Sequence, residues 1–213
     1  MMEDRPVNME LSKDVKEIDQ FLSDYEKYPL EVLTSMWIFE RIPYVFNNDF
    51  TEYLKVKLII SKSIGVDLCS IFFVGSSSVG FSLNPAKNLK PFDAQSDIDI
   101  AIVSHYYFDI AWRTIQDIDF STMTWQIQNS ISEHRGRLIY WETIALDKIL
   151  GIMPFAKEWM SVLEELKRLP PFRDREVSFR LYRNHEALRR YHINNFHKFL
   201  PRILGVEPQS ITL

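Results

Sequence analysis

Two aspartates at the start of an apolar run are the residues of this sequence best suited to do chemistry. Asp97 and Asp99 alternate with Ile98 and Ile100. Successive side chains of a strand point to opposite faces, so we expect both carboxylates on one face and both isoleucines in the core. Two such carboxylates repel each other unless a cation lies between them. Mg²⁺ is commonly held by one or two carboxylates together with substrate phosphates, so the pair predicts a magnesium site.

A glycine–serine segment follows an earlier apolar run and supplies groups that bind phosphates. The run 70–74 ends at Gly75, and three serines follow, beginning with Ser76 and Ser77. A glycine lets backbone amides approach a phosphate closely because it has no Cβ, and the hydroxyls add further donors. Paired aspartates are usually solvated, and a Gly-Ser turn is usually only a turn. Their order along the chain is what indicates a combined phosphate and metal site.

This order of motifs resembles the DNA polymerase β-like nucleotidyltransferase superfamily. Its members have an apolar strand ending in Gly-Ser, then an Asp-x-Asp strand, then a third acidic residue on a later strand. Gly75 and Ser76 match the first element, Asp97 and Asp99 match the second, and the resemblance covers roughly residues 68–145. It implies that the aspartates hold Mg²⁺ or Mn²⁺, which activates a nucleoside triphosphate whose phosphates rest on the Gly-Ser turn. Small bacterial members include antibiotic-modifying enzymes, toxin–antitoxin proteins and nucleotide synthases of antiviral defence.

The third acidic residue has two candidates. Glu142 lies on a strand predicted over 137–143, and we take it as the third catalytic and metal-binding carboxylate. Asp119, at a predicted helix end, is the weaker candidate. If neither serves, the chain would bind nucleotide without turning it over.

The connection between the two motifs is longer than the family's usual spacing, as though residues 84–94 were inserted. This segment contains Lys87 and Lys90. It is either a loop that faces the substrate or a plain surface excursion.

Basic residues gather near the end of the sequence. Residues 172–202 carry 8 basic and 3 acidic side chains, whereas residues 1–60 carry 7 basic and 12 acidic ones. Such an asymmetry indicates a local anion site, with a solvated helix face as the alternative. Arg180 and Arg183 flank the end of a predicted strand and could reach the β- and γ-phosphates of a nucleotide, or pair with nearby acidic side chains.

Length and composition describe an ordinary globular protein. The chain has 213 residues, of which 46% are hydrophobic and 25% charged, so it is neither a disordered tail nor a disulfide miniprotein. Its single cysteine, Cys69, cannot form an internal disulfide, which favours a reducing compartment. No stretch approaches the roughly 20 apolar residues of a membrane helix, and the acidic N-terminus is unlike a secretory signal. We therefore expect a cytoplasmic protein without membrane contact.

The elements that must position these residues alternate between helices and short buried strands. This predicts an α/β (α+β) domain with a mixed sheet flanked by helices, which the resemblance implies is nucleotidyltransferase-like, with residues 1–66 as an N-terminal helical layer packed on a core of residues 67–213. Strands are expected at 70–74, 98–103, 137–143 and 177–182, and helices at 11–27, 30–42, 50–64, 107–118, 122–133, 155–166 and 185–199.

The function that the resemblance implies is that of a metal-dependent nucleotidyltransferase. It would move a nucleoside monophosphate from a triphosphate to an acceptor, which could be RNA, a protein or a small molecule. The alternative is a catalytically degenerate module that binds nucleotide and acts through a partner protein encoded by a neighbouring gene.

Overall fold

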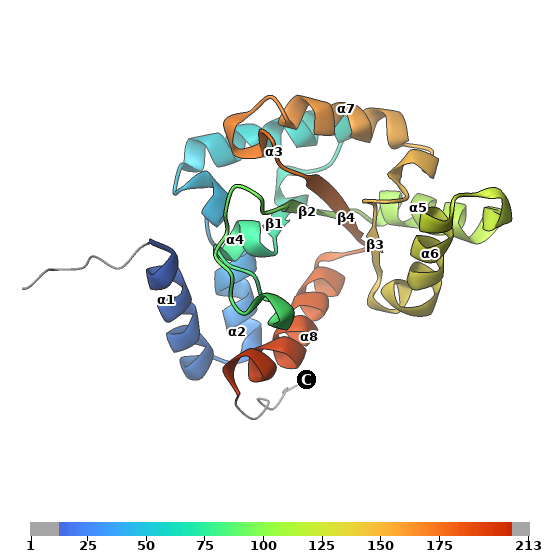
Figure 1. Cartoon of the computed structure of the whole chain (residues 1–213). Coiled ribbons are helices and arrows are strands. Elements are labelled where there is room, and N and C mark those ends of the chain that lie inside the picture. Colours follow the sequence, from blue (N-terminus) through green and yellow to red (C-terminus); the bar gives the residue numbers. More distant parts are fainter. Residues whose placement is uncertain (1–12, 206–213) are drawn as a thin grey trace, which may run out of the picture.

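A computed structural model gives the structure of the chain and describes residues 13–205. The described part is a mixed α/β fold whose four-stranded sheet lies between two groups of helices (Figure 1). The strands are β1 (Ile71–Val74), β2 (Ile98–Val103), β3 (Thr143–Ala145) and β4 (Val177–Tyr182). The α-helices are α1 (Lys13–Lys27), α2 (Leu30–Thr34), α3 (Phe50–Ile64), α4 (Ser76–Val79), α5 (His105–Asp117), α6 (Trp125–Glu133), α7 (Ala156–Leu166) and α8 (His185–Leu204).

The sheet has the order β1-β2-β4-β3 and is mixed. β2 runs antiparallel to β1 and parallel to β4, and β3 pairs antiparallel with β4. Asp99 therefore lies between Val74 on one side and Ser178 on the other. Because β2 and β4 are parallel and in register, the residues that precede both strands reach the same edge of the sheet.

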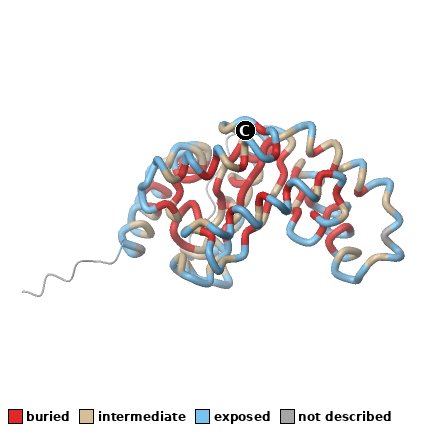
Figure 2. Tube along the Cα trace, turned by 90° about the horizontal axis from the view of Figure 1, so that it is seen from above, coloured by how far each residue is buried: buried red, intermediate tan, exposed pale blue. Residues whose placement is uncertain are grey.

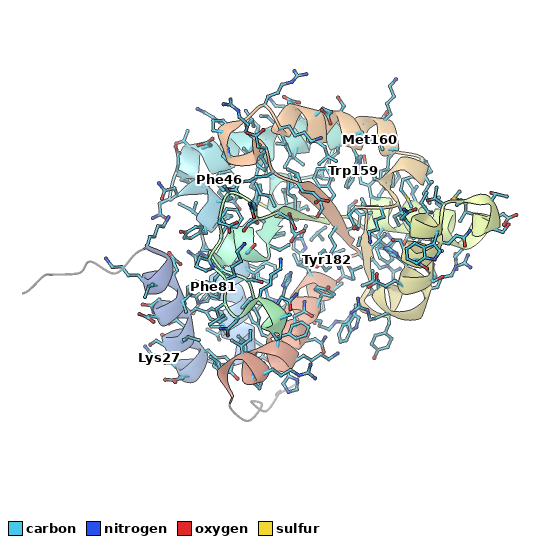
Figure 3. All side chains as sticks on the ribbon, in the orientation of Figure 1. Lys27, Phe46, Phe81, Trp159, Met160 and Tyr182 are labelled. Atoms are coloured by element: carbon cyan, nitrogen blue, oxygen red, sulfur yellow. The ribbon has the colours of Figure 1, made fainter. Side chains whose placement is uncertain are left out.

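Each face of the sheet is covered by its own apolar cluster. Ile100 and Phe179 belong to the cluster beneath α3, α5 and α7, whereas Ala101 and Tyr182 belong to the cluster beneath α1, α2 and α8. Figure 2 shows the buried segments running through the middle of the molecule, with exposed residues on the outer helices. Phe46 and Trp159 lie on the first side and Phe81 and Tyr182 on the second (Figure 3). Asp99 shares the second face with Ala101, because the two are separated by one residue.

Helix ends follow the local sequence. Asp49 accepts a hydrogen bond from the amide of Glu52 and begins α3, and Gly65 ends it in the left-handed conformation. Asn184 begins α8 in the same way, by accepting a hydrogen bond from the amide of Ala187. These capping residues explain why the expected helices 50–64 and 185–199 are present, the second extended to Leu204.

Two expectations about elements are wrong. Residues 137–143 do not form a strand: residues 134–141 form π and 3₁₀ turns, and β3 begins only at Thr143. The helix expected over 30–42 ends as an α-helix at Thr34 and continues as a π-helix to Phe39. Both segments have the expected pattern of apolar residues. Their backbone hydrogen bonds, however, join residues three or five apart, as in 3₁₀- and π-helices.

Candidate functional site

Asp97 and Asp99 lie at the edge of the sheet where β2 and β4 begin. Asp99 is inside β2, and Asp97 is an exposed residue directly before it. The preceding turn is anchored by Arg175, whose guanidinium donates hydrogen bonds to the backbone carbonyls of Asp93 and Ser96. The approach of the chain to Asp97 is thus fixed by a side chain located just ahead of β4.

Both oxygens of the Asp99 carboxylate have a defined environment. Oδ1 accepts a hydrogen bond of 2.8 Å from the hydroxyl of Ser178 on the neighbouring strand. Oδ2 faces Gly75, and a Cβ built on that glycine would lie 2.9 Å from this oxygen. Gly75 also has φ +65° and ψ −151°, a conformation that is almost confined to glycine. The absence of a side chain at position 75 therefore leaves room for the Asp99 carboxylate next to the Gly-Ser turn.

The electrostatics of Asp99 are those of a crowded acidic site. Burial raises the pKa of its carboxyl, and the negative charges of Asp97 and Asp147 add to this effect. The hydrogen bond from Ser178 and the positive charge of Arg180 act in the opposite direction without cancelling it. The raised pKa means that the folded protein disfavours the ionised carboxylate, mainly because it is removed from water, and a bound cation would favour the ionised form.

Two cavities meet at this pair of aspartates. The larger has a volume of about 380 Å³ and also borders Gly75 and Ser76, the loop between Ser82 and Pro91, and α8. The smaller, of about 150 Å³, is bordered by Asp147, Glu176, Ser178 and Arg180 in addition to Asp97 and Asp99. The first has lysines in its wall, whereas the second is predominantly acidic.

The segment 84–94 forms one wall of the larger cavity. Asn84, Lys87, Lys90 and Pro91 border it, and the 3₁₀ turn at Pro85–Lys87 lies against α8 (Figure 1). Lys90 also forms an ion pair of 2.7 Å with Asp93. Of the two alternatives for this segment, the geometry favours a loop that faces the cavity.

The three serines of the Gly-Ser turn have different roles. Ser76 borders the larger cavity. Ser77 and Ser78 are buried, and their hydroxyls donate to the backbone carbonyls of Val74 at 2.8 Å and of Trp37 at 3.0 Å. We expected the hydroxyl of Ser77 to bind phosphate. In the structure it is instead used to hold the turn against β1.

Arg180 and Arg183 lie three residues apart but have different surroundings, because Arg180 is inside β4 and Arg183 directly follows it. Arg180 is largely buried, borders the smaller cavity and donates a hydrogen bond of 3.1 Å to the hydroxyl of Tyr191. Arg183 lies beyond the far end of β4, where it pairs with Glu142 at 2.9 Å and approaches Asp109 at 3.9 Å. Arg183 borders neither cavity.

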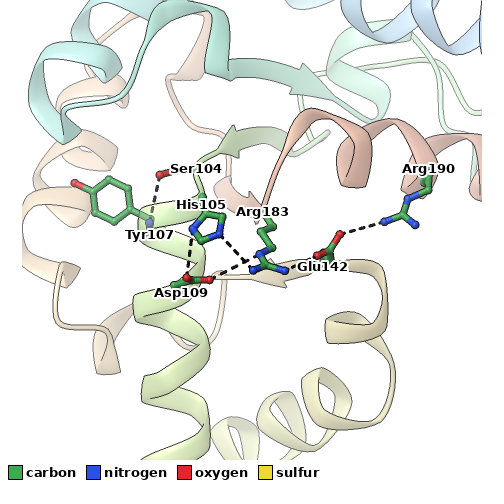
Figure 4. A network of polar contacts seen from close by, with 7 residues as sticks. All are labelled: Ser104, His105, Tyr107, Asp109, Glu142, Arg183 and Arg190. Carbon is green, nitrogen blue, oxygen red and sulfur yellow. Dashed lines mark hydrogen bonds and ion pairs between the residues drawn. The ribbon is translucent and has the colours of Figure 1, made fainter.

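Glu142 belongs to the group of charged side chains around Arg183, which is distant from Asp97 and Asp99. Its carboxylate pairs with Arg183 and, at 3.1 Å, with Arg190, and Figure 4 shows the three side chains with His105 and Asp109. The reason is the direction of β3: Thr143 pairs with Tyr182 at the end of β4, whereas Asp99 pairs with Ser178 near its beginning. Thr143 is therefore about 13 Å along the strands from Asp99, and Glu142, one residue farther away, does not join it.

Asp119 is also far from the aspartate pair. It follows α5, which leads away from the end of β2, and its carboxylate accepts hydrogen bonds from the amide and hydroxyl of Ser121. It borders neither cavity.

Two acidic residues that the sequence reasoning missed stand closer to the pair. Glu176 precedes β4 as Asp97 precedes β2, and its carbonyl accepts a hydrogen bond of 2.9 Å from the amide of Ile98. Asp147 comes two residues after β3 and borders the same cavity. The sequence signal that could have identified both residues is an acidic side chain directly before or after an apolar run. Between residues 13 and 205, however, no three His, Cys, Asp or Glu side chains are close enough together to hold a metal ion.

Comparison of the sequence with protein-family models, with curated proteins and with solved structures found no match. Among the helices of the described part, none is both long and apolar enough to cross a bilayer.

Proposed function

We propose that this chain is a metal-dependent nucleotidyltransferase whose site is the aspartate pair and the Gly-Ser turn. One observation carries the proposal: Oδ2 of Asp99 lies directly beside Gly75, in a cavity that also borders Asp97 and two lysines. The residues suited to a divalent cation and those suited to phosphates are thus neighbours in space, as the resemblance requires.

The donor set suits a hard divalent cation such as Mg²⁺ or Mn²⁺. Asp97 and Asp99 provide carboxylate oxygens, and burial together with the neighbouring acids Asp97 and Asp147 raises the pKa of Asp99, an effect that a bound cation would oppose. Asp97 and Asp99 would hold the ion, and Asp147 or Glu176 replaces Glu142 as the candidate for a third carboxylate. When bound, the ion would neutralise phosphate charge and polarise the acceptor hydroxyl.

The protein's own groups would orient the reactants. The backbone at Gly75 and Ser76, together with Lys87 and Lys90, would bind the triphosphate in the larger cavity. In the reaction an acceptor oxygen forms a bond to the α-phosphorus, the bond from that phosphorus to the β-phosphate oxygen breaks, and pyrophosphate leaves. The acceptor loses its hydroxyl proton to solvent. The hydroxyl of Ser178 fixes Asp99 in the rotamer that faces the turn.

A second candidate is a module that binds nucleotide without turnover and acts through a partner protein. Two observations favour it. The position beside Asp99 on β4 is Ser178 rather than an acid, and the described residues contain no group of three potential metal ligands. On this alternative the site would bind a metal–nucleotide complex without turning it over, and the occupied site would contact the partner protein.

Titration calorimetry with ATP and Mg²⁺, beside an assay of pyrophosphate release from labelled triphosphates, separates the two candidates. We expect binding and release in the wild type, and loss of release in the variant Asp97→Asn/Asp99→Asn. Glu142→Gln serves as the matched control, because it also removes a carboxylate but lies outside both cavities. Binding without release from any triphosphate would select the second candidate. Absence of Mg²⁺-dependent binding would contradict both.

A further inference from the structure

A pair of aromatic side chains lies at the surface beside α8, away from both cavities. Tyr140 and Trp141 end the 3₁₀ turn Ile139–Trp141, and their rings meet edge to face with 5.3 Å between the centroids. Tyr140 has 81% of its surface exposed, more than any other large apolar side chain in the described part of the chain, and Trp141 is half-buried. The Tyr140 ring thus contributes little to the core, and its surface is available to another molecule.

Cationic side chains of α8 lie next to this pair. The ammonium of Lys198 is 5.9 Å from the centre of the Trp141 ring, and Arg190 binds Glu142, the residue after Trp141, at 3.1 Å. Arg202 follows Lys198 by four residues, so the two project from the same side of the helix. Both are exposed, and neither forms an ion pair with another residue between 13 and 205. Their charges are therefore available to an anionic ligand.

The combination of exposed rings and unpaired cations suits a single strand of nucleic acid. Proteins bind single strands by stacking bases on aromatic rings while lysines and arginines contact the phosphates. Because Lys198 lies over Trp141, a base stacked on this pair would bring its phosphate close to an ammonium group.

A protein partner suits this surface less well. The centre of a protein interface is an apolar patch, whereas the other exposed large apolar side chains of the described residues lie on other elements, such as α3 and α7. The surface beside α8 has two rings surrounded by polar and charged groups.

We propose that Tyr140, Trp141, Lys198 and Arg202 form a surface that binds single-stranded nucleic acid without selecting a sequence. The two rings would stack with bases, and the two cations would contact phosphates. This inference does not rest on the proposed function, because none of the four residues borders either cavity.

Fluorescence anisotropy of the full chain with a labelled oligothymidylate of about 12 nucleotides tests the proposal. An abasic strand of the same length keeps the phosphates and lacks the bases. We expect the wild type to bind the oligothymidylate at least about tenfold more tightly than the abasic strand, a difference of 1.4 kcal/mol. Tyr140→Ala should remove most of this preference, whereas Tyr140→Phe, which keeps the ring, should retain it. Trp125→Ala is the matched control, because Trp125 is 72% exposed on α6 and its loss should change nothing.

Lys198→Gln tests the contribution of charge. It should weaken binding of both strands and lower the slope of log affinity against log salt concentration by about 0.7, the value for one phosphate contact of a single strand. Lys55→Gln is its control, because it removes an exposed lysine from α3, which covers the opposite face of the sheet from α8. Equal losses in the two lysine variants would overturn the inference.

Three further outcomes would also overturn it. The first is that the wild type binds neither strand at low salt, and the second is that it binds both strands equally. The third is that polyglutamate competes as well as the oligothymidylate, which would indicate an acidic protein as the partner instead. Thermal melts verify that each variant is folded, and Tyr140→Ala should melt as the wild type does because its ring is largely exposed.

Discussion

At the scale of single residues, Asp99 is the most constrained side chain of the candidate site. One of its oxygens is held by Ser178, and the other occupies the space that Gly75 leaves open. The ionised carboxylate of Asp99 lowers the stability of the fold, because it is partly removed from water and lies near the negative charges of Asp97 and Asp147. The consequences of this arrangement can be measured in the absence of any substrate.

The first prediction is that Asp99→Asn stabilises the metal-free protein at neutral pH. A folded-state pKa raised above the ordinary value of about 3.9 means that the fold favours the protonated carboxyl. That contribution is complete below about pH 3.9 and is lost as the pH rises through the folded pKa, so ionised Asp99 destabilises the fold at pH 7. Asparagine still accepts the hydrogen bond from Ser178 and carries no charge. We expect a gain of about 1 kcal/mol, or about 2–4 °C in melting temperature.

Thermal melts at pH 7 and pH 3.5, in the presence of a chelator, check this prediction. The difference between wild type and variant should shrink at the lower pH, where both side chains are neutral. A large loss of stability at pH 7 would show instead that the ionised carboxylate supports the fold.

The second prediction concerns Gly75. Its backbone conformation costs a residue with a side chain about 1–3 kcal/mol, and a Cβ would also collide with Oδ2 of Asp99. Gly75→Ala should therefore destabilise the protein whether or not the turn binds phosphate. Gly75→Ala/Asp99→Ala should cost less than the sum of the two single substitutions, because the collision disappears. Urea denaturation of the four proteins gives the coupling, and strict additivity would contradict the close approach.

Sequence reasoning reached Asp97 and Asp99 because strand alternation and one apolar run contain enough information to place both carboxylates on one face. It could not place His192 in the interior, because a histidine on an amphipathic helix looks the same in sequence whether its ring is exposed or buried. Asp147 and Glu176 were missed because their proximity to Asp99 depends on strand pairing between segments about 30 to 80 residues apart.

At the scale of elements, the register of β3 decides which acid can reach the site. The apolar residues before Thr143 resemble a strand in sequence, but they form helical turns, and only three residues pair with β4. As a result Glu142 takes a left-handed conformation, with φ 50°, at the end of β4 that is distant from Asp99. Local sequence cannot set this register, because it depends on which distant strand offers a free edge.

The third prediction follows from this register. Glu142→Gln should leave Mg²⁺-dependent nucleotide binding and turnover unchanged and lower stability by at most about 1 kcal/mol, since its two ion pairs lie near the surface. Asp147→Asn, which removes the same charge at the smaller cavity, should reduce turnover at least tenfold if the chain is an enzyme. Pyrophosphate release by both variants gives the comparison. The reverse order of effects would restore Glu142 as the third carboxylate.

At the scale of the whole molecule, the basic C-terminal segment is not a single free cationic surface. Arg175 binds backbone carbonyls ahead of Asp97, Arg180 contacts Tyr191, and Arg189 donates to the hydroxyl of Ser35. Arg183 and Arg190 both pair with Glu142. The positive charge that composition revealed is therefore distributed over contacts that hold α8, β4 and their neighbours together. Composition reports the amount of charge, whereas its accessibility depends on the fold.

The fourth prediction is that the loop lysines, rather than these arginines, supply the salt-dependent part of nucleotide affinity. Lys87 is exposed and borders the larger cavity, whereas Arg190, on α8, borders neither cavity and has Glu142 and Glu186 as partners. Lys87→Gln should weaken binding of a Mg²⁺–triphosphate about tenfold at low salt, equivalent to 1.4 kcal/mol. This loss should diminish as the salt concentration rises and screening shortens the reach of the lysine charge. Arg190→Gln removes the same charge from the molecule and should change affinity by less than about twofold. Calorimetric titrations of both variants at two salt concentrations check this prediction. Equal losses of affinity in Lys87→Gln and Arg190→Gln would mean that nucleotide binding responds to the overall charge of the protein. In that case residues 84–94 would not contact the nucleotide.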